Sequence, residues 1–295
     1  MKKVQVLFAA LAIMSAVPLL VPAQTPPPYS MLDPVPYNPA VDPNIDMFIG
    51  SWTESMPRQA HGSLIERDIL TRGDPLTPSI RGAVLTYVNR FVHASLEAGA
   101  STTPAVLDGE QEIYYILSGR GTLTAGKKTA DLYQGIAVLM PANLEFRMKN
   151  TGDDPLTMYL VAEPCPAGFR YNTEMLVVDE NTTPVSSSDA HWVGIVKQLF
   201  STKDGLGTLE SILTCQFDPM TFFHPHSHDK GTEEVWCTIN GDVYVLLGKQ
   251  IRRQPPGTAY MIPPDSKTPH ANFNVSDSMI NMFYFARYSD HEVRK

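Results

Sequence analysis

The fold of this chain is decided by two stretches that resemble each other, EIYYILSG at residues 112–119 and EVWCTING at residues 234–241. Each begins with glutamate, continues through a short apolar run and ends with glycine. The residues that recur at a constant offset of 122 are Glu112, Gly119, Gly135 and Pro141 in the first copy and Glu234, Gly241, Gly257 and Pro263 in the second. A repeat of this length corresponds to one small domain, so the chain is expected to contain two copies of it.

The structural class of each copy follows from the segments around these landmarks. Short β-prone runs such as residues 83–88, 113–117 and 243–247 are separated by Gly, Pro, Asn and Asp. Many short strands broken by turn residues are typical of all-β sandwiches and barrels. The sequence therefore predicts an all-β protein.

Composition divides the 295 residues into five parts. Residues 1–23 have the character of a signal peptide. Residues 24–58 are rich in proline, which favours an extended arm that wraps over a barrel or a partner subunit. The first β domain is assigned to residues 59–175 and the second to residues 190–295. Between them, residues 176–189 contain NTTPVSSSD and are expected to form a linker.

The first 23 residues contain the three parts of a secretory signal. Lys2 and Lys3 supply a positive start, residues 4–20 are almost entirely apolar, and residues 21–23 (VPA) precede the expected cut at Gln24. The alternative is a retained membrane anchor, but the apolar stretch ends in prolines rather than in a charged stop. The protein is therefore expected to be exported to the periplasm or secreted, with no membrane attachment after cleavage.

Charge excludes one class of partner. The formal net charge is −8, and removal of the two signal lysines makes it −10. No basic cluster occurs anywhere in the sequence. Because nucleic-acid binding depends on Lys and Arg contacts to phosphate, a nucleic-acid partner is not expected.

Candidate metal ligands are concentrated in the second copy. Four of the eight histidines lie there, within 47 residues: His224, His226, His228 and His270. Residues at positions i, i+2 and i+4 of a strand point to one face, so the histidines of the run FHPHSH are expected to point the same way. Glu234 begins the next strand. Three imidazoles and one carboxylate suit Mn, Fe, Co, Ni, Cu or Zn, and the sequence predicts one divalent metal ion held by His226, His228, Glu234 and His270.

These motifs resemble the cupin superfamily. Its two motifs are approximately G-x5-HxH-x3,4-E-x6-G and G-x5-P-x-G-x2-H-x3-N. The second copy has HxH at 226–228, Glu234-x6-Gly241, Gly257-x5-Pro263 and His270-x3-Asn274. The resemblance implies a bicupin, with two tandem double-stranded β-helix (jelly-roll) barrels behind the proline-rich arm.

The second copy departs from the cupin motifs in three places. Met220 stands where the opening glycine belongs, and the glycine after the proline is replaced around Asp265-Ser266. The loop before Glu234 is one residue longer than usual, so Glu233 is an alternative ligand. Glu234 is preferred because it keeps the x6-Gly spacing.

The first copy keeps the frame of the motifs and lacks the ligands. Ala105, Leu107 and Phe146 stand at the positions of the three histidines. This barrel is expected to bind no metal and to be structural or to bind an apolar ligand. Glu112 alone is expected to be a polar residue whose hydrogen bonds are satisfied.

Around the predicted metal, two residues are candidates for acid–base catalysis. His224 and Glu233 are close to the ligands in sequence, and His224 is also a possible fourth imidazole or proton shuttle. The candidates for the wall of the site are Phe223, Trp236, Tyr260, Asn272 and Tyr284. Arg252 and Arg253 could hold a substrate carboxylate if one of them turned inward, although a hairpin surface suits them better.

The cupin resemblance implies a range of functions. Similar cupins are dioxygenases, decarboxylases, isomerases, lyases and aminohydrolases, and they share a small polar or carboxylated substrate bound to Mn or Fe. The leading hypothesis is therefore a metal-dependent enzyme. The alternative is a periplasmic protein that binds a small molecule or a metal without turnover. The intact ligand set argues against a third possibility, a storage role.

Two questions of assembly remain open from sequence. The protein could form a homodimer by exchange of edge strands or of the arm. Cys215 and Cys237 could form a disulfide if their strands are neighbours, and buried reduced cysteines are the alternative.

Overall fold

The computed structural model describes residues 36–186 and 194–291. The signal peptide and the first part of the proline-rich arm, up to residue 35, lie outside the described residues. So do residues 187–189, the second half of the stretch PVSSSD in the predicted linker. None of the helices in the described ranges is long and apolar enough to cross a bilayer.

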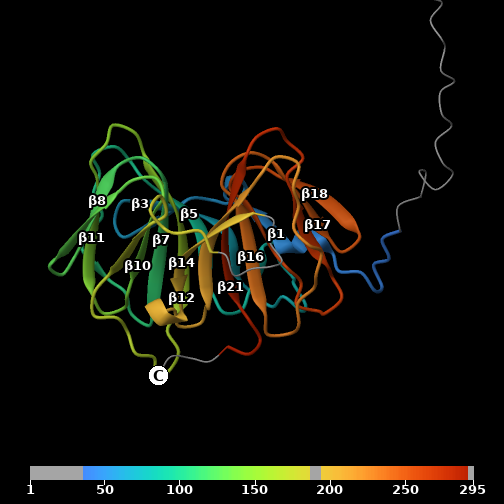
Figure 1. Ribbon diagram of the computed structural model, residues 1–295. Coiled ribbons are helices and arrows are strands. Elements are labelled where there is room, and N and C mark those ends of the chain that lie inside the picture. The colour runs from blue at the N-terminus through green and yellow to red at the C-terminus, as the bar shows by residue number, and fades with distance from the viewer. Residues whose placement is uncertain (1–35, 187–193, 292–295) are drawn as a thin grey trace, which may run out of the picture. The chain divides into compact units, whose positions relative to one another are not determined.

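The first barrel is built from two sheets, and Figure 1 labels several of their strands. The larger has the strand order β13-β10-β7-β12-β5-β3-β2, with β4 beside β3, and the smaller has the order β6-β11-β8-β9. The strands are β2 (Arg58–Ala60), β3 (Leu64–Arg72), β4 (Ala83–Leu85), β5 (Arg90–Leu96), β6 (Ala105–Val106), β7 (Glu110–Ser118), β8 (Gly121–Ala125), β9 (Lys128–Leu132), β10 (Ile136–Met140), β11 (Glu145–Asn150), β12 (Leu156–Pro164) and β13 (Leu176–Asp179).

The second barrel repeats this plan. Its sheets have the orders β1-β19-β16-β21-β15-β14 and β18-β17-β20. The strands are β14 (Ile195–Ser201), β15 (Ser211–Phe217), β16 (Glu233–Thr238), β17 (Val243–Leu247), β18 (Gln250–Gln254), β19 (Thr258–Met261), β20 (His270–Phe273) and β21 (Ile280–Arg287), with a 3-10 turn, η4, at Thr202–Asp204. Strands β17 and β18 match β8 and β9 at the predicted offset of 122 residues. The prediction of two tandem all-β barrels is therefore confirmed.

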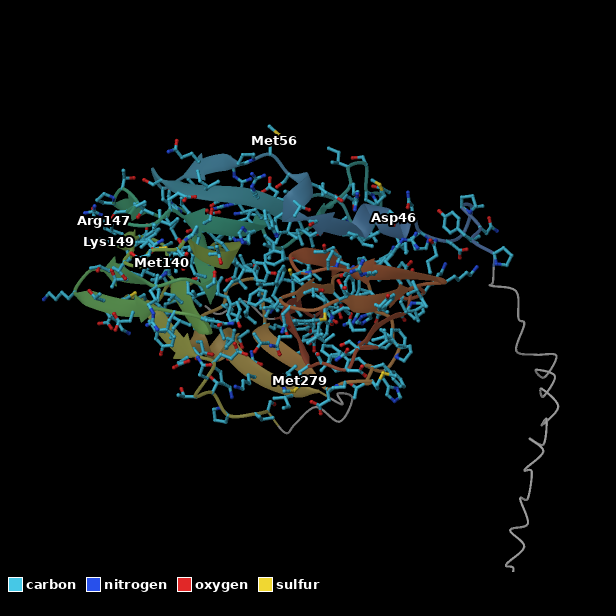
Figure 2. All side chains as sticks on the ribbon, turned by 90° about the horizontal axis from the view of Figure 1, so that it is seen from above. Asp46, Met56, Met140, Arg147, Lys149 and Met279 are labelled. Atoms are coloured by element: carbon cyan, nitrogen blue, oxygen red, sulfur yellow. The ribbon has the colours of Figure 1, made fainter. Side chains whose placement is uncertain are left out.

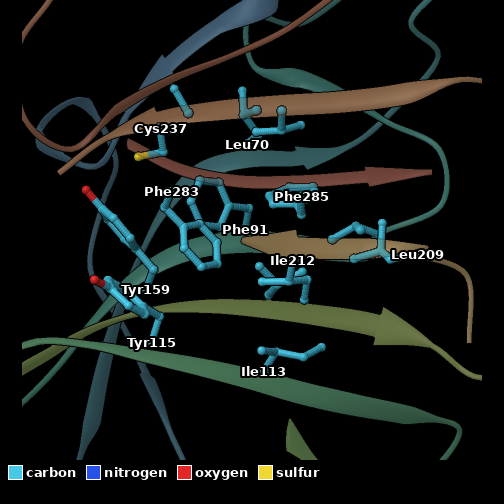
Figure 3. Packing of buried hydrophobic residues seen from close by; sticks show 14 of the residues in the cluster. Leu70, Phe91, Ile113, Tyr115, Tyr159, Leu209, Ile212, Cys237, Phe283 and Phe285 are labelled. Carbon is cyan, nitrogen blue, oxygen red and sulfur yellow. The ribbon is translucent and has the colours of Figure 1, made fainter. Parts of the chain in front are cut away.

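Apolar side chains form three clusters. One fills the first barrel and includes Tyr114 and Met148, and another fills the second barrel and includes Trp236 and Tyr284. The third joins the outer faces of the two larger sheets, where Phe91 of β5 stacks on Phe283 of β21. Figure 3 shows this cluster. Alternation along each strand sends one side chain into a barrel and the next into the joint.

Two buried carboxylates also join the barrels, one from each side. Glu163 of β12 accepts hydrogen bonds from the backbone amides of residues 207–209. Glu233 of β16 accepts hydrogen bonds from the backbone amides of residues 86–87. Residues 86–87 match residues 208–209 at the offset of 122, so equivalent loops of the two barrels supply the backbone amides that bind the two carboxylates.

The described end of the arm belongs to the second barrel. After the 3-10 turn η2 (Ile45–Phe48), β1 (Ile49–Ser51) pairs antiparallel with β19, as the blue strand in Figure 1 shows. The following turn, η3 (Trp52–Glu54), places the Trp52 ring against His93 of the first barrel, with ring centroids 4.6 Å apart. Gly257 lies under the same indole, and a Cβ added there would come within 2.1 Å of its Nε1.

The predicted linker begins with a strand. Leu176–Asp179 forms β13, which pairs with β10 at the edge of the larger sheet of the first barrel. The stretch between the barrels is therefore shorter than residues 176–189.

A disulfide between Cys215 and Cys237 is incompatible with this fold. Cys215 lies on β15 and Cys237 on β16, and β21 pairs with both strands and separates them. The two side chains also point to opposite faces, since one belongs to the cluster inside the second barrel and the other to the joint. Strands that are two positions apart are roughly 9.5 Å from each other, and a disulfide needs Cα atoms within about 7 Å.

His93 is expected to make the fold sensitive to acid. Burial, together with the nearby Arg67, lowers the pKa of His93 to about 4. Its neutral form is therefore favoured in the folded state, and stability is lost as the pH falls from the unfolded value of 6.5. Between pH 7.5 and 4.5 the unfolding free energy of the wild type should fall by about 2 to 3 kcal/mol more than that of His93→Phe, which keeps the stacking on Trp52. Urea unfolding at several pH values measures this difference, and equal slopes for the two proteins would contradict the prediction.

Candidate metal centre

The predicted ligands come from three separate segments of the second barrel. His226 and His228 lie in the loop between β15 and β16, Glu234 lies on β16, and His270 begins β20. A two-way backbone bridge between His226 and His270 aligns the loop with β20. In the described structure the run FHPHSH contains one isolated bridge, at His226, and no ladder, so it is not a regular strand.

The structure brings the four side chains together. One ligand atom from each of His226, His228, Glu234 and His270 lies within 4.8 Å of the others. Nε2 of His226 is 3.2 Å from Nε2 of His270, and Nε2 of His228 is 3.1 Å from a carboxylate oxygen of Glu234. His226 is exposed at the mouth of the barrel, whereas Glu234 and His270 are buried.

Hydrogen bonds orient two of the imidazoles. Nδ1 of His226 lies 2.9 Å from the carbonyl oxygen of His224, which can only accept, so Nδ1 carries the proton. The Tyr260 hydroxyl donates to Asn272 at 2.8 Å and lies 3.3 Å from Nδ1 of His270, from which it can accept. Both rings thus present an unprotonated Nε2 to the site, the arrangement in which outer hydrogen bonds fix a metal-binding histidine.

Glu234 is held by neighbours inside the barrel. Its carboxylate accepts a hydrogen bond from the Trp236 indole at 2.7 Å and from the Tyr284 hydroxyl at 3.2 Å. Burial would raise the pKa of Glu234, but His228, His270 and the Trp236 N–H lower it to about 2. The carboxylate is therefore anionic at neutral pH.

The histidines are also suited to ligation. Burial, together with His226 and His228, lowers the pKa of His270 to about 3 in spite of Glu234, so its ring is neutral. Nε2 of His228 is buried and has no hydrogen-bond partner, because its contact with Glu234 lacks hydrogen-bond geometry. A buried nitrogen in this state costs free energy, and a cation between the three imidazoles and the carboxylate would satisfy it. The donor set of three nitrogens and one carboxylate therefore fits a divalent transition metal.

At the two positions where the second copy lacks the glycines of the cupin motifs, the backbone keeps a left-handed conformation. Met220 has φ of 59° and Ser266 has φ of 58°, both in the left-handed region that glycine occupies easily. In the first barrel Gly99, at the position that matches Met220, has φ of 70°. The chain conformation is thus kept where the residue type is not.

The two predicted acid–base residues are not part of the group. Glu233 lies on the opposite side of β16 from Glu234, and its carboxylate binds the amides of residues 86–87 in the joint between the barrels. Burial raises the pKa of Glu233 to about 7 although these amides oppose the rise. The prediction that Glu233 acts at the site, as base or as ligand, is wrong because consecutive strand residues point to opposite faces. The His224 side chain is exposed and outside the group, and its carbonyl is what serves the site.

The predicted wall residues surround the ligands on the inner side. Phe223, Trp236, Tyr260, Asn272 and Tyr284 are all buried inside the second barrel. Arg252 and Arg253 do not turn inward. They lie on the hairpin of β18 and bind Asp46 and Asp242.

The first barrel holds an ion-pair cluster in the corresponding place. Glu112 is fully buried and accepts hydrogen bonds from His61, Arg90 and Tyr114, which confirms that its hydrogen bonds are satisfied. Arg90 also contacts Glu66 at 3.3 Å, so a guanidinium lies where the second barrel collects its imidazoles. His61, Glu66 and Glu112 are close enough to share an ion, but Glu112 is already occupied by these cationic and hydroxyl donors.

Sequence reasoning missed His61 and Arg90. The buried Leu107 and Phe146 occupy ligand positions in the first barrel as predicted. His61, however, precedes the repeat and has no counterpart in the second copy. The one feature of the sequence that marks the position of His61 is the glycine that follows it. His61 and Gly62 form a left-handed turn that leads the chain into β3.

Replacing each of the two adjacent glutamates by glutamine, in separate variants, distinguishes the roles that the structure gives them. Glu234→Gln replaces an anionic ligand by a neutral amide, so affinity for Mn²⁺ or Zn²⁺ should fall at least about tenfold. Glu233→Gln is the matched control, and its affinity should equal that of the wild type because Glu233 faces the joint. Competition with a metal-chelating dye measures both. A larger loss in Glu233→Gln than in Glu234→Gln would refute the assignment.

Comparison with known proteins agrees with the fold. The sequence pattern of the cupin domain matches residues 92–162, which span β5 to β12 of the first barrel. No curated protein matches the chain.

Solved structures share the two-barrel fold at low sequence identity. A glyoxylate-induced protein from Pseudomonas aeruginosa is similar with a TM-score of 0.66 and 12% identity, over 90% of this chain and 98% of the other. A single-substitution variant of oxalate decarboxylase from Bacillus subtilis has a TM-score of 0.60 and 13% identity, over 83% and 78%. Vicilin from hazelnut, Corylus avellana, has a TM-score of 0.62 and 10% identity, over 82% and 86%. The first barrel therefore matches the cupin domain, and the chain as described has the two-barrel fold of these structures.

Proposed function

We propose that the protein is a metal-dependent enzyme that acts on a small polar or carboxylated substrate at the mouth of its second barrel. The observation that carries the proposal is the convergence of His226, His228, Glu234 and His270 within 4.8 Å. The Nε2 atoms of His226 and His270 are kept unprotonated by the hydrogen bonds on the far side of these two rings.

These four side chains would hold the metal, and Mn or Fe suits the mixed nitrogen and oxygen donors. When bound, such an ion supplies Lewis acidity toward a carboxylate or electron-transfer chemistry with dioxygen. Four protein ligands leave one or two coordination positions open in the usual geometries of these ions.

The barrel restricts where a substrate can enter. On the inner side of the ligands the space is filled by the buried rings of Trp236, Tyr260 and Tyr284. His226, by contrast, is exposed. A substrate therefore approaches from the side of His226, and a small one fits this rim better than a ligand that must be engulfed by the barrel.

The placement of the acid–base candidates narrows the reaction type. Glu233 faces the other barrel and the His224 side chain points to solvent. Isomerisation and elimination begin with proton abstraction from carbon, for which a positioned base is needed. Decarboxylation and dioxygenation do not begin in this way and suit the arrangement better. Similarity to oxalate decarboxylase at 13% identity establishes the fold alone, but it makes small dicarboxylates the first substrates to test.

Turnover should depend on His226 and not on His224. Protein loaded anaerobically with Mn²⁺ or Fe²⁺ is assayed for CO₂ release and O₂ consumption with oxalate and other small carboxylates. His226→Ala removes a ligand and should lose the bound metal and at least about 90% of the activity. His224→Ala keeps the backbone carbonyl and should retain both.

The second candidate function is binding without turnover, which the absence of His224 and Glu233 from the group favours. In that case His226→Ala would again lose the metal and His224→Ala would keep it, as measured by inductively coupled plasma mass spectrometry. Calorimetry would detect carboxylate binding while no product forms. Absence of metal after loading with each candidate ion would refute both functions.

We also propose that the protein works outside the cytoplasm. The support is the sequence of residues 1–23, with Lys2 and Lys3 before an apolar run and VPA before Gln24. Expression of the full chain in a Gram-negative host should yield a periplasmic or secreted form that begins at Gln24, which N-terminal sequencing identifies. A form that retains Met1 and sediments with membranes would contradict this proposal.

A further inference from the structure

The smaller sheet of the second barrel has an apolar outer face. Its inner side chains, Val243, Val245 and Leu247 of β17, are fully buried. The alternate residues of β17, Tyr244 and Leu246, therefore point outward.

The neighbours of these two residues continue the apolar face. Tyr244 pairs with Phe273 of β20, and Leu246 pairs with Ile251 of β18. Phe222 is bridged to Phe273 and stacks on its ring with centroids 5.8 Å apart. Ile251 is 58% exposed, Phe222 52% and Tyr244 36%. The outer apolar face consists of five side chains: Phe222, Tyr244, Leu246, Ile251 and Phe273.

The first barrel shows that the fold does not require an apolar surface at this place. The equivalent sheet presents Thr122, Thr124, Thr129, Arg147 and Lys149, which pair in the same register. Tyr244, Leu246 and Ile251 match the three threonines at the offset of 122 residues, and Phe273 matches Lys149 at an offset of 124. Figure 2 labels Arg147 and Lys149 at the surface of the first barrel. One copy thus has the polar face of a solvated sheet, and the other has a contact surface.

The apolar area extends beyond the sheet. The turns before Phe222 and after Phe273 are joined by a hydrogen bond between Asn274 and Thr221. These turns carry Met220, Val275 and Met279, each more than half exposed. With the outer apolar face, these side chains expose roughly 600 Å², taking about 150–250 Å² for each large side chain. A stable interface needs about 800 Å² per partner, so this surface is close to the size of a complete interface.

We propose that the outer apolar face is the interface of a homodimer, in which the face of one chain packs on the same face of a second copy. A two-fold axis brings identical patches together, and the five side chains of the outer apolar face are uncharged, so their contact avoids the repulsion that the net charge of −8 creates elsewhere. The one charged side chain in its rows is Arg253, which is already bound to Asp242 at 2.5 Å. The two larger sheets of the chain bury their apolar outer faces in the same way, by packing on each other.

Sedimentation velocity tests the proposal with substitutions taken from the first barrel. The wild-type mature chain at about 50 µM, well above a micromolar Kd, should sediment as a dimer. Tyr244→Thr combined with Ile251→Thr gives this face the threonines of the first barrel and should weaken dimerisation at least about tenfold. The control is Val106→Thr, since Val106 lies on the smaller sheet of the first barrel and is 56% exposed. This variant should remain dimeric.

Hydrogen exchange of the wild type provides a second measurement that needs no variant. Amide protection in residues 243–254 and 270–273 should rise between about 1 and 50 µM protein, while residues 121–132 should not change. A wild type that stays monomeric at the higher concentration would overturn the proposal. A dimer that survives both threonine substitutions would also overturn it, and would assign the contact to exchanged strands or to the arm.

Discussion

Burying a carboxylate costs several kcal/mol unless it has hydrogen-bond partners. This chain buries two carboxylates between its barrels. Glu163 and Glu233 are stable there because each accepts hydrogen bonds from backbone amides of the opposite barrel. Backbone amides cannot move without the loop that carries them. The two contacts therefore fix the translation and the rotation of one barrel on the other more tightly than the surrounding apolar cluster could, because apolar packing has little directionality.

The candidate metal centre depends on this constraint. Glu233 and Glu234 are adjacent on β16, and anchoring the first in the joint turns the second into the barrel. The indole of Trp236 and the hydroxyl of Tyr284 then set the carboxylate of Glu234 opposite the imidazoles. The strand that holds the barrels together is thus also the strand that completes the ligand set.

Much of this arrangement was predictable from the sequence. The repeat at an offset of 122 residues predicted two barrels, and the histidine spacing with the cupin resemblance predicted the group of His226, His228, Glu234 and His270. Strand alternation also placed His224 with them, but its side chain lies outside the group. The choice between Glu233 and Glu234 was open because a shift of one residue reverses the face, and spacing alone was its guide. His61 and Arg90 were missed because the contacts that bring them to Glu112 join residues up to 51 positions apart, outside any repeated pattern. The pairing of β1 with β19 could not be predicted from the sequence either, since any extended segment can pair with the edge strand of a sheet.

Met220 and Ser266 have a consequence for how relatives of this protein are recognised. A comparison of sequences rewards glycine at positions where the backbone turns left-handed, and it has no means of seeing that methionine or serine takes the same turn. Here the family pattern matches the barrel whose ligand positions are apolar and passes over the one that gathers the histidines. A search for similar sites is better based on backbone dihedral angles and the HxH spacing than on the glycines. Such a search would find chains that keep the metal-ligand residues but have lost the glycines of the motifs.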